Sequence, residues 1–227
     1  MGNGYINQII HAKIEDVIDD LPEVDLLLID PPYGISADSV MSKQGGREND
    51  PGFKKSPTRQ SKCAKREYAD YGWDKSTIDM QLMNKLMSKA KNSIIWGGNY
   101  YPLPPSACWV VWDKNINGNF ADCELAWTNL KGAVRMIKHT WNGMLREGQE
   151  KRYHPTQKPE NVISFCIDLY TKVNKKKPKL VLDCFAGSGT TLKVCQKKGI
   201  DFIGVEMIKE YVEICKNRLS QGSLFSV

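Results

Sequence analysis

Two short runs of residues in this chain combine side chains that could do chemistry. The first, Asp30-Pro31-Pro32-Tyr33, follows the apolar stretch 26–29 and so stands at the end of a predicted strand. Two consecutive prolines remove two backbone donors and fix φ, which holds the carbonyl oxygens there as acceptors. Asp30 could accept one N–H of an exocyclic amine and the Pro31 carbonyl the other, while Tyr33 offers a ring for stacking. The alternative is a strand-terminating turn in which Asp30 caps a helix.

The second run, at 183–189, follows the apolar stretch 180–182 and contains a Gly-x-Gly turn. Such a turn between a strand and a helix lets the backbone approach a nucleotide-like cofactor. A dinucleotide site would have a third small residue where this chain has Leu192, and a P-loop would end in Gly-Lys-Ser/Thr. Glu206 ends the next predicted strand, where it could accept hydrogen bonds from both ribose hydroxyls. The alternatives are an ordinary tight turn and a solvated carboxylate at a helix start.

The composition is that of one packed domain. A chain of 227 residues with 41% hydrophobic residues has the size and apolar content of a single α/β domain. No apolar run approaches membrane-spanning length and the first residues lack a secretory signal, so we expect a cytoplasmic protein. The seven cysteines are scattered without a C-x-x-C pair, which argues against a metal site. A net charge of +6 is compatible with a polyanionic partner but is common in other proteins.

Hydrophobic periodicity predicts alternating strands and helices. Strands are expected at 6–10, 24–29, 93–96, 109–112, 179–182 and 202–206, and helices at 14–18, 78–90, 159–173, 190–198 and 211–219. This alternation favours a mostly parallel sheet with helices on both faces. From about 36 to 70 the apolar pattern fails, and this basic insert is expected to be a functional lid or a disordered loop.

Three ordered motifs resemble those of the S-adenosylmethionine-dependent amino-methyltransferases of DNA. Asp30-Pro31-Pro32-Tyr33 matches their catalytic motif, and Asp183-x-Phe185-x-Gly187-x-Gly189-Thr190-Thr191 matches their cofactor motif. The segment His154-Pro155-Thr156-Gln157-Lys158-Pro159 is similar to the one that precedes the cofactor half in this family. The order of the motifs is similar to that of the β group. The segments 96–100 and 120–124 also resemble small phage-type adenine methylases.

The resemblance implies an α/β protein with the class I methyltransferase fold, in one permuted domain over residues 1–227. Its sheet would have seven strands, mostly parallel, with one reversed. Asp30, Pro31, Pro32 and Tyr33 would be the catalytic residues. The implied cofactor-binding residues are Asp183, Phe185, Gly187, Gly189, Thr190, Thr191, Glu206, His154, Thr156 and Lys158. Lys158 would pair with the methionine carboxylate of S-adenosylmethionine. Lys13 is a departure, because family members often have Asp near that position.

The implied reaction is methyl transfer from S-adenosylmethionine to N6 of a flipped adenine in double-stranded DNA. A target-recognition segment is expected at about 115–152. Candidate DNA contacts are Asn129, Lys131, Arg135, Lys138 and Trp141, with Lys54, Lys55 and Arg59 in the basic insert. For the residues of the recognition segment, a surface-loop or core-aromatic role is the alternative. Cytosine-N4 methylation and a catalytically idle DNA-binding protein of the same fold also remain open.

The expected partners follow from the same resemblance. They are double-stranded DNA and, through the Q-x-x-L-F-like tail Gln221–Phe225, a bacterial sliding clamp; the alternative for this tail is a chance pentapeptide. No metal and no membrane are expected, and the protein would be a monomer or homodimer. It would work in the cytoplasm of a bacterial cell or a phage-infected host, within or outside a restriction-modification system.

Overall fold

The computed structural model describes residues 3–36, 72, 74–115, 121–141, 150–153 and 156–223. The chain divides into two compact units, one formed by Met1–Pro31 and Ile78–Val227 and the other by Pro32–Thr77. Most of the predicted basic insert at 36–70 lies outside the described residues. In the described part of the second unit, Tyr33 and Thr77 form an isolated antiparallel bridge.

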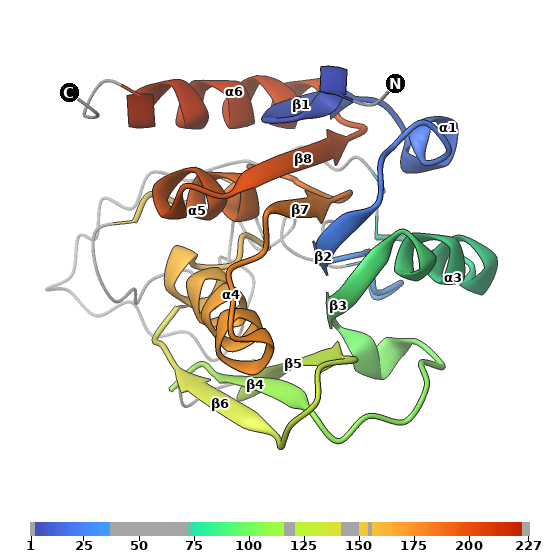
Figure 1. Cartoon of the computed structure of the whole chain (residues 1–227), viewed down its shortest axis with the longest axis vertical. Coiled ribbons are helices and arrows are strands. Elements are labelled where there is room, and N and C mark those ends of the chain that lie inside the picture. The colour runs from blue at the N-terminus through green and yellow to red at the C-terminus, as the bar shows by residue number, and fades with distance from the viewer. Residues whose placement is uncertain are drawn as a thin grey trace, which may run out of the picture. The chain divides into compact units, whose positions relative to one another are not determined.

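A mixed β-sheet forms the centre of the first unit (Figure 1). Its described strands, in spatial order, are β1 (Gln8–His11), β8 (Asp201–Glu206), β7 (Leu180–Asp183), β2 (Val24–Ile29), β3 (Ala90–Trp96), β5 (Cys123–Thr128), β4 (Trp109–Asp113) and β6 (Arg135–Lys138). Neighbouring strands pair in parallel except at β5, which is antiparallel to both of its neighbours. The expectation of a mostly parallel sheet with one reversed strand is therefore confirmed.

The expected number of seven strands is wrong, because the described residues form an eight-stranded sheet. Apolar periodicity predicts neither β5 nor β6, and β6 pairs with β4 at the edge of the sheet. Three of its four residues are exposed, and only Ile137 is half-buried. An edge strand with so little buried surface lacks the apolar alternation by which strands are recognised in a sequence.

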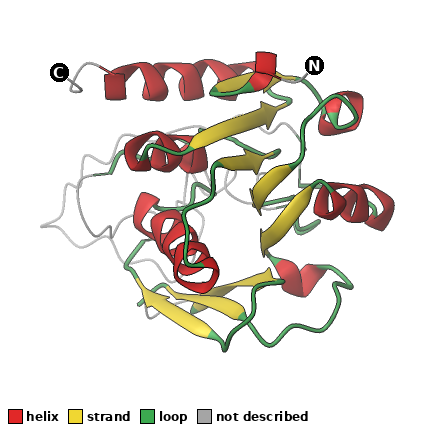
Figure 2. Ribbon diagram, in the orientation of Figure 1, coloured by secondary structure: helices red, strands yellow, loops and turns green. Residues whose placement is uncertain are grey.

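Helices cover both faces of the sheet (Figure 2). The described helices are α1 (Ile14–Val17), α3 (Met80–Ser88), α4 (Glu160–Asn174), α5 (Thr190–Lys198) and α6 (Lys209–Ser223), with 3-10 turns η1 (Asn3–Tyr5) and η3 (Gly98–Tyr100). Residues of β2 alternate between the two faces: Leu26 and Leu28 pack with α4 and α5, and Leu27 and Ile29 with α1 and α3. A sheet buried on both sides explains why β2 reads as an uninterrupted apolar run.

The ends of the helices follow from local chemistry. Asp79 caps α3, because its side chain accepts a hydrogen bond from the Leu82 N–H at 2.7 Å. Pro159 stands at the N-cap of α4, as its missing N–H allows. Gly199 ends α5 with φ +64°, the left-handed conformation that glycine adopts without strain. Among the described residues, no helix is long and apolar enough to span a membrane.

Candidate active site

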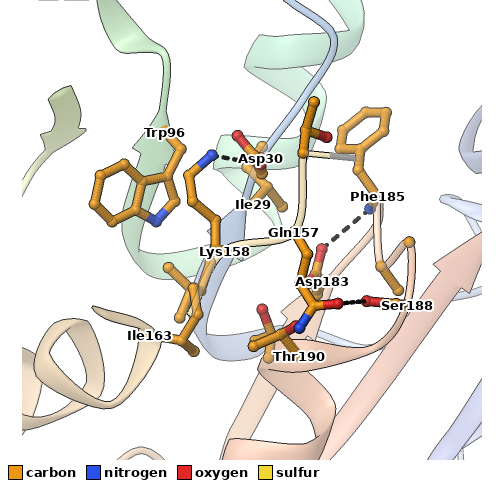
Figure 3. A pocket seen from close by; sticks show the side chains of 15 residues that line it. Ile29, Asp30, Trp96, Gln157, Lys158, Ile163, Asp183, Phe185, Ser188 and Thr190 are labelled. Atoms are coloured by element: carbon orange, nitrogen blue, oxygen red, sulfur yellow. Dashed lines mark hydrogen bonds and ion pairs between the residues drawn. The ribbon is translucent and has the colours of Figure 1, made fainter. Parts of the chain in front are cut away.

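A cleft opens at the edge of the sheet where the central parallel strands end (Figure 3). Its lining comes from residues 28–30, 156–158 and 185–188, with Trp96, Ile163, Asp183, Thr190 and Thr191. The carboxyl ends of parallel strands meet at one edge of a sheet, which is where ligands bind in open α/β proteins. Asp30 follows β2 and Asp183 ends β7, its neighbour, so the strand order brings two distant carboxylates to one cleft.

Most of the residues predicted for the cofactor lie around this cleft. Those that line it are Thr156, Lys158, Asp183, Phe185, Gly187, Thr190 and Thr191. Gly189 and Glu206 lie next to this lining, because Gly189 precedes Thr190 and the Glu206 carboxylate accepts the Gly187 N–H at 2.8 Å. His154 lies outside the described residues.

The glycine turn between β7 and α5 has a conformation that requires glycine at two positions. Gly187 has φ +51° and Gly189 has φ +78°. At Gly189 there is a second constraint, because a Cβ atom would collide with Sγ of Cys215 in α6. The turn is closed by the Gly189 N–H, which donates to the Ala186 carbonyl at 2.7 Å. Helix α5 therefore begins close against α6, with its N-terminus beside the cleft.

Glu206 is held in place from both sides. Its Oε2 accepts the Gly187 N–H and its Oε1 the Ile208 N–H, each at 2.8 Å. The side chain is only 8% exposed, so the alternative of a solvated helix-start carboxylate is wrong. Burial raises the pKa of Glu206, and the backbone N–H donors oppose this shift. Nearby, Lys13 is exposed at the start of α1 and makes no side-chain capping hydrogen bond.

Asp183 carries the most perturbed carboxylate of the cleft. Burial raises its pKa to about 7, and the negative charges of Asp30 and Glu206 act in the same direction. Hydrogen bonds from the Thr191 hydroxyl and the Phe185 N–H lower the pKa but do not offset the burial. A carboxylate at 5% exposure beside two other carboxylates makes the cleft favourable for a cation.

Lys158 lies between two carboxylates. Its Nζ is 2.6 Å from Oδ2 of Asp30 and 2.9 Å from Oε2 of Glu124, and it stands over the Trp96 ring at 5.3 Å from the centroid. The lysine was expected to pair with the cofactor's carboxylate, but the structure gives it two carboxylates of the chain itself.

Asp30 is not a helix cap, since no helix begins within the described residues 31–36.

Glu124 is a site residue that the sequence did not predict. Lys114 Nζ lies 2.6 Å from its Oε1, so that the carboxylate has a lysine on each oxygen. Burial alone would raise its pKa, but Lys158 and Lys114 lower it to about 2. The signal in the sequence was one acidic residue directly before the apolar run 125–127, in a stretch where no strand is predicted.

The segment before α4 is tied to the glycine turn by polar residues that also escaped prediction. Gln157 Oε1 accepts hydrogen bonds from the Tyr153 N–H at 2.7 Å and the Ser188 hydroxyl at 3.2 Å. Behind the turn, the buried Arg218 donates to the Ser188 carbonyl at 2.7 Å and pairs with Glu160 at 3.4 Å. Two segments far apart in the sequence are thereby fixed to each other.

The unit boundary falls inside the Asp-Pro-Pro-Tyr run, after Pro31. In the second unit, Asp74 is 1% exposed, and its Oδ1 accepts the N–H groups of Tyr33 at 2.6 Å and Gly34 at 3.0 Å. These are the first two backbone donors after the prolines. Asp74 was not among the predicted residues, since nothing in the sequence relates it to the turn.

The predicted DNA contacts differ in their surroundings. Lys131, Arg135 and Lys138 are exposed on β6 and the loop before it. Asn129 is also exposed, but its Oδ1 accepts the Ser93 N–H at 2.8 Å and so supports the sheet. Trp141 is 5% exposed in the core, which favours the alternative of a core aromatic. Lys54, Lys55 and Arg59 lie outside the described residues.

Within the described part of the chain, no cluster of His, Cys, Asp or Glu has the arrangement of a metal site.

Comparison with known proteins shows to which family the chain belongs. A family model described as DNA methylase, covering the N6 and N4 methyltransferases, matches residues 53–217. The chain belongs to this DNA methylase family. Over 95 residues it is 40% identical to the type II methyltransferase M2.LlaDCHI of Lactococcus lactis, a match that covers 41% of this chain and 34% of the relative. Over 77 residues it is 39% identical to the DNA adenine methyltransferase YhdJ of Escherichia coli, covering 34% of this chain and 25% of that protein.

These matched segments span only a quarter to a third of the relatives' length. Solved structures match over more of the chain. The M1.HpyAVI–SAM complex has a TM-score of 0.55 at 21% identity and covers 93% of this chain and 98% of its own. The cytosine-N4-specific PvuII DNA methyltransferase has a TM-score of 0.54 at 15% identity, and the match covers 95% of this chain and 89% of that protein. The class I methyltransferase fold of these structures is also the fold of this chain.

Proposed function

We propose that this protein transfers the methyl group of S-adenosylmethionine to N6 of adenine in double-stranded DNA. The observation that carries the proposal is that the predicted catalytic carboxylate, Asp30, and the predicted cofactor turn at 183–189 line one cleft. The two runs are far apart in the sequence, and only the tertiary fold brings them together.

The charges of the cleft fit this cofactor. S-adenosylmethionine carries a positive sulfonium and an ammonium group, and the cleft holds Asp30 and the buried Asp183, with Glu206 close by. A cationic ligand would relieve the mutual repulsion that helps to raise the pKa of Asp183. Glu206 has a backbone donor on each oxygen, and a carboxylate has further lone pairs for ribose hydroxyls. When bound, the cofactor supplies an electrophilic methyl group.

The chain's own residues would act mainly by positioning and electrostatics. Asp30 would accept one N–H of the target amine and the Pro31 carbonyl the other, which draws the nitrogen lone pair away from the ring. Lys158 beside Asp30 favours the ionised form of this carboxylate, the form that accepts hydrogen bonds. As the N–CH3 bond would form, the S–CH3 bond would break, the thioether would leave, and the positive charge would pass from sulfur to nitrogen. The methylated amine, now cationic and acidic, would lose its proton to water, so a strong general base is unnecessary.

The choice of adenine rests on two supports. Asp at the head of the Asp-Pro-Pro-Tyr run is the form that leans toward adenine in this family, and one of the relatives is named a DNA adenine methyltransferase. The second candidate is cytosine-N4 methylation, because an N4-specific enzyme shares the fold. Both reactions place an exocyclic amine against Asp30.

The remaining parts of the proposal concern the partners. Exposed Lys131, Arg135 and Lys138 would contact the DNA backbone, and the adenine would be flipped out of the duplex to reach the cleft. The proposed setting is the inside of a bacterial cell or phage-infected host. The proposed clamp segment Gln221–Phe225 lies only partly within the described residues, and deleting 222–227 would test it through clamp binding.

The deciding experiment combines labelled S-adenosylmethionine with unmethylated DNA of varied sequence, followed by digestion to nucleosides. We expect label in N6-methyladenine at a defined sequence. Asp30→Ala should abolish transfer and leave cofactor affinity, measured by calorimetry, within about twofold, because Asp30 acts on the amine. Label in N4-methylcytosine would replace the adenine assignment with the second candidate. DNA binding without transfer would identify a catalytically idle member of the family.

A further inference from the structure

Four charged side chains form a continuous chain that ends at Asp30. In order they are Lys114, Glu124, Lys158 and Asp30, and the successive N···O distances are 2.6, 2.9 and 2.6 Å. They come from the end of β4, from β5, from the segment before α4, and from the end of β2. The four charges sum to zero, which suits a partly buried position.

Lys158 is the centre of this arrangement. Its side chain is 7% exposed, so its ammonium has left water and depends on the groups around it. Burial disfavours its charge, but Asp30 and Glu124 outweigh that effect and raise its pKa. The face of Trp96 adds a further favourable contact for the ammonium. Figure 3 shows the lysine reaching past this ring to Asp30.

We propose that Glu124 is a positioning residue for the Asp30 carboxylate and acts through Lys158. The inference rests on the proposed function for the role of Asp30 in holding the amine. An ammonium paired with Asp30 alone would compete with the amine for the carboxylate oxygens. Glu124 attracts the same ammonium from 2.9 Å and so weakens its hold on Asp30, whose carboxylate oxygens then remain able to accept from the substrate.

The other charged and titratable groups around Asp30 do not supply this function. Asp183 on β7 is a second carboxylate, which repels Asp30 when both are ionised and so cannot hold Lys158 away from it. Cys166 on α4 faces Lys158, but burial raises the pKa of its thiol far above neutrality. Lys114 contacts Glu124 at the far end of the chain of charges. Glu124 is therefore the described carboxylate that shares Lys158 with Asp30.

Two substitutions should act in opposite directions. Glu124→Gln removes the second carboxylate beside Lys158, so the ammonium interacts more strongly with Asp30 and the acid limb of the pH profile of kcat should move to lower pH. At the same time kcat should fall about tenfold with KM for DNA little changed, as expected for competition with one charge-assisted hydrogen bond. Lys158→Met removes the cation beside Asp30, so the acid limb should move up by about one pH unit. Glu124 keeps Lys114 in this second variant and is not left as an unpaired buried charge.

A readout that needs no catalysis is the ¹³C-detected titration of the Asp30 carboxyl in the free protein, assigned by its loss in Asp30→Asn. Its midpoint should rise in Lys158→Met and fall in Glu124→Gln. The matched control is Lys91→Met, which breaks the 2.7 Å ion pair with Asp25 at the opposite end of β2. This variant should change neither the midpoint of the Asp30 titration nor the acid limb of the pH profile of kcat. Thermal unfolding of each variant would show that the fold is retained.

Equal midpoints in all variants, or shifts in the same direction, would overturn the inference. A wild-type protein that transfers no methyl group to DNA would instead overturn the proposed function. The carboxyl titration decides the inference in either case, so the two failures are distinguishable.

Discussion

At the scale of single residues, the cleft is defined by carboxylates whose charges depend on their neighbours. Asp30 is paired with Lys158, Glu206 is held by backbone N–H groups, and Asp183 has burial and two carboxylates acting on it. The three groups have similar chemistry in the sequence and different roles in the structure. Asp30 forms an ion pair, Glu206 accepts backbone hydrogen bonds, and the pKa of Asp183 is raised to near neutrality.

The affinity for S-adenosylmethionine should depend on the protonation of Asp183. Because its pKa is raised to about 7, the carboxyl becomes neutral as the pH falls through 7 and no longer attracts a cationic ligand. Affinity should therefore be full above pH 8 and decrease toward pH 6, with proton release on binding near pH 7. Calorimetry in buffers of different ionisation enthalpy measures both effects. Asp183→Asn should bind weakly and without this pH dependence; an unchanged pH dependence in this variant would assign the effect elsewhere.

Arg218 should contribute strongly to stability. Its guanidinium is 2% exposed, bonds to Ser188, and pairs with Glu160. Arg218→Met leaves the carboxylate and the Ser188 carbonyl without this donor, and we expect about 3–5 kcal/mol loss in the free energy of unfolding by urea. Lys216→Met on the exposed part of the same helix is the control and should change it by less than about 0.5 kcal/mol. A small effect of Arg218→Met would show that the turn does not depend on this residue.

At the scale of elements, the glycine turn at 183–189 depends on the contact between α5 and α6. Gly189 combines a positive φ with a close approach to Cys215, so the turn and the second helix constrain each other. On the other side, Gln157 bonds the segment before α4 to the same turn. The turn is therefore held from two elements that the local sequence does not reveal.

Gly189→Ala should destabilise the protein by about 2–4 kcal/mol and weaken cofactor binding. The reasons are the strained backbone and the collision of the new Cβ with Cys215. The double variant Gly189→Ala/Cys215→Ala should recover part of this loss compared with the sum of the single variants, because it removes the sulfur atom. Urea unfolding of the four proteins in a double-mutant cycle measures the coupling. Strict additivity would mean that the sulfur is not the obstacle.

At the scale of the whole molecule, the net charge of +6 suits a polyanionic partner, but its distribution matters more than its sum. Several described lysines, among them Lys85, Lys91 and Lys216, are paired with carboxylates. Lys131, Arg135 and Lys138 instead form an exposed basic group on and before the edge strand β6. We expect this surface to account for much of the salt dependence of DNA binding.

The triple variant Lys131→Ala/Arg135→Ala/Lys138→Ala should weaken DNA binding and reduce the slope of log K against log salt by about 2–3, since each phosphate contact contributes about 0.9. Fluorescence anisotropy at several salt concentrations measures both. Neutralising Lys85, Lys91 and Lys216 removes the same net charge from residues paired with Asp19, Asp25 and Glu213. An equal reduction of the slope in this control would attribute it to net charge and not to a DNA-binding surface.

The elements with strong periodicity were predictable from the sequence. The predicted strand at 24–29 and helix at 190–198 have the observed bounds, because β2 is buried on both faces and α5 begins and ends at glycines. β5 and β6 escaped prediction, because only three consecutive residues of β5 are buried and β6 has a single half-buried residue. The order of the three motifs was also sufficient to indicate the family.

The sequence by itself determined the residue types of the site and the elements that carry them, since turn chemistry and apolar periodicity are local properties. Only the tertiary structure decided their partners. It placed Lys158 between Asp30 and Glu124, brought Asp74 to the Tyr33 N–H, and put Arg218 behind the glycine turn. These contacts join residues that are distant in the chain, and they depend on strand order and on the loss of water around each charge. A local sequence pattern contains no information on strand order or on the loss of water around a charge. The ion pairs of the site therefore could not be predicted before the fold was known.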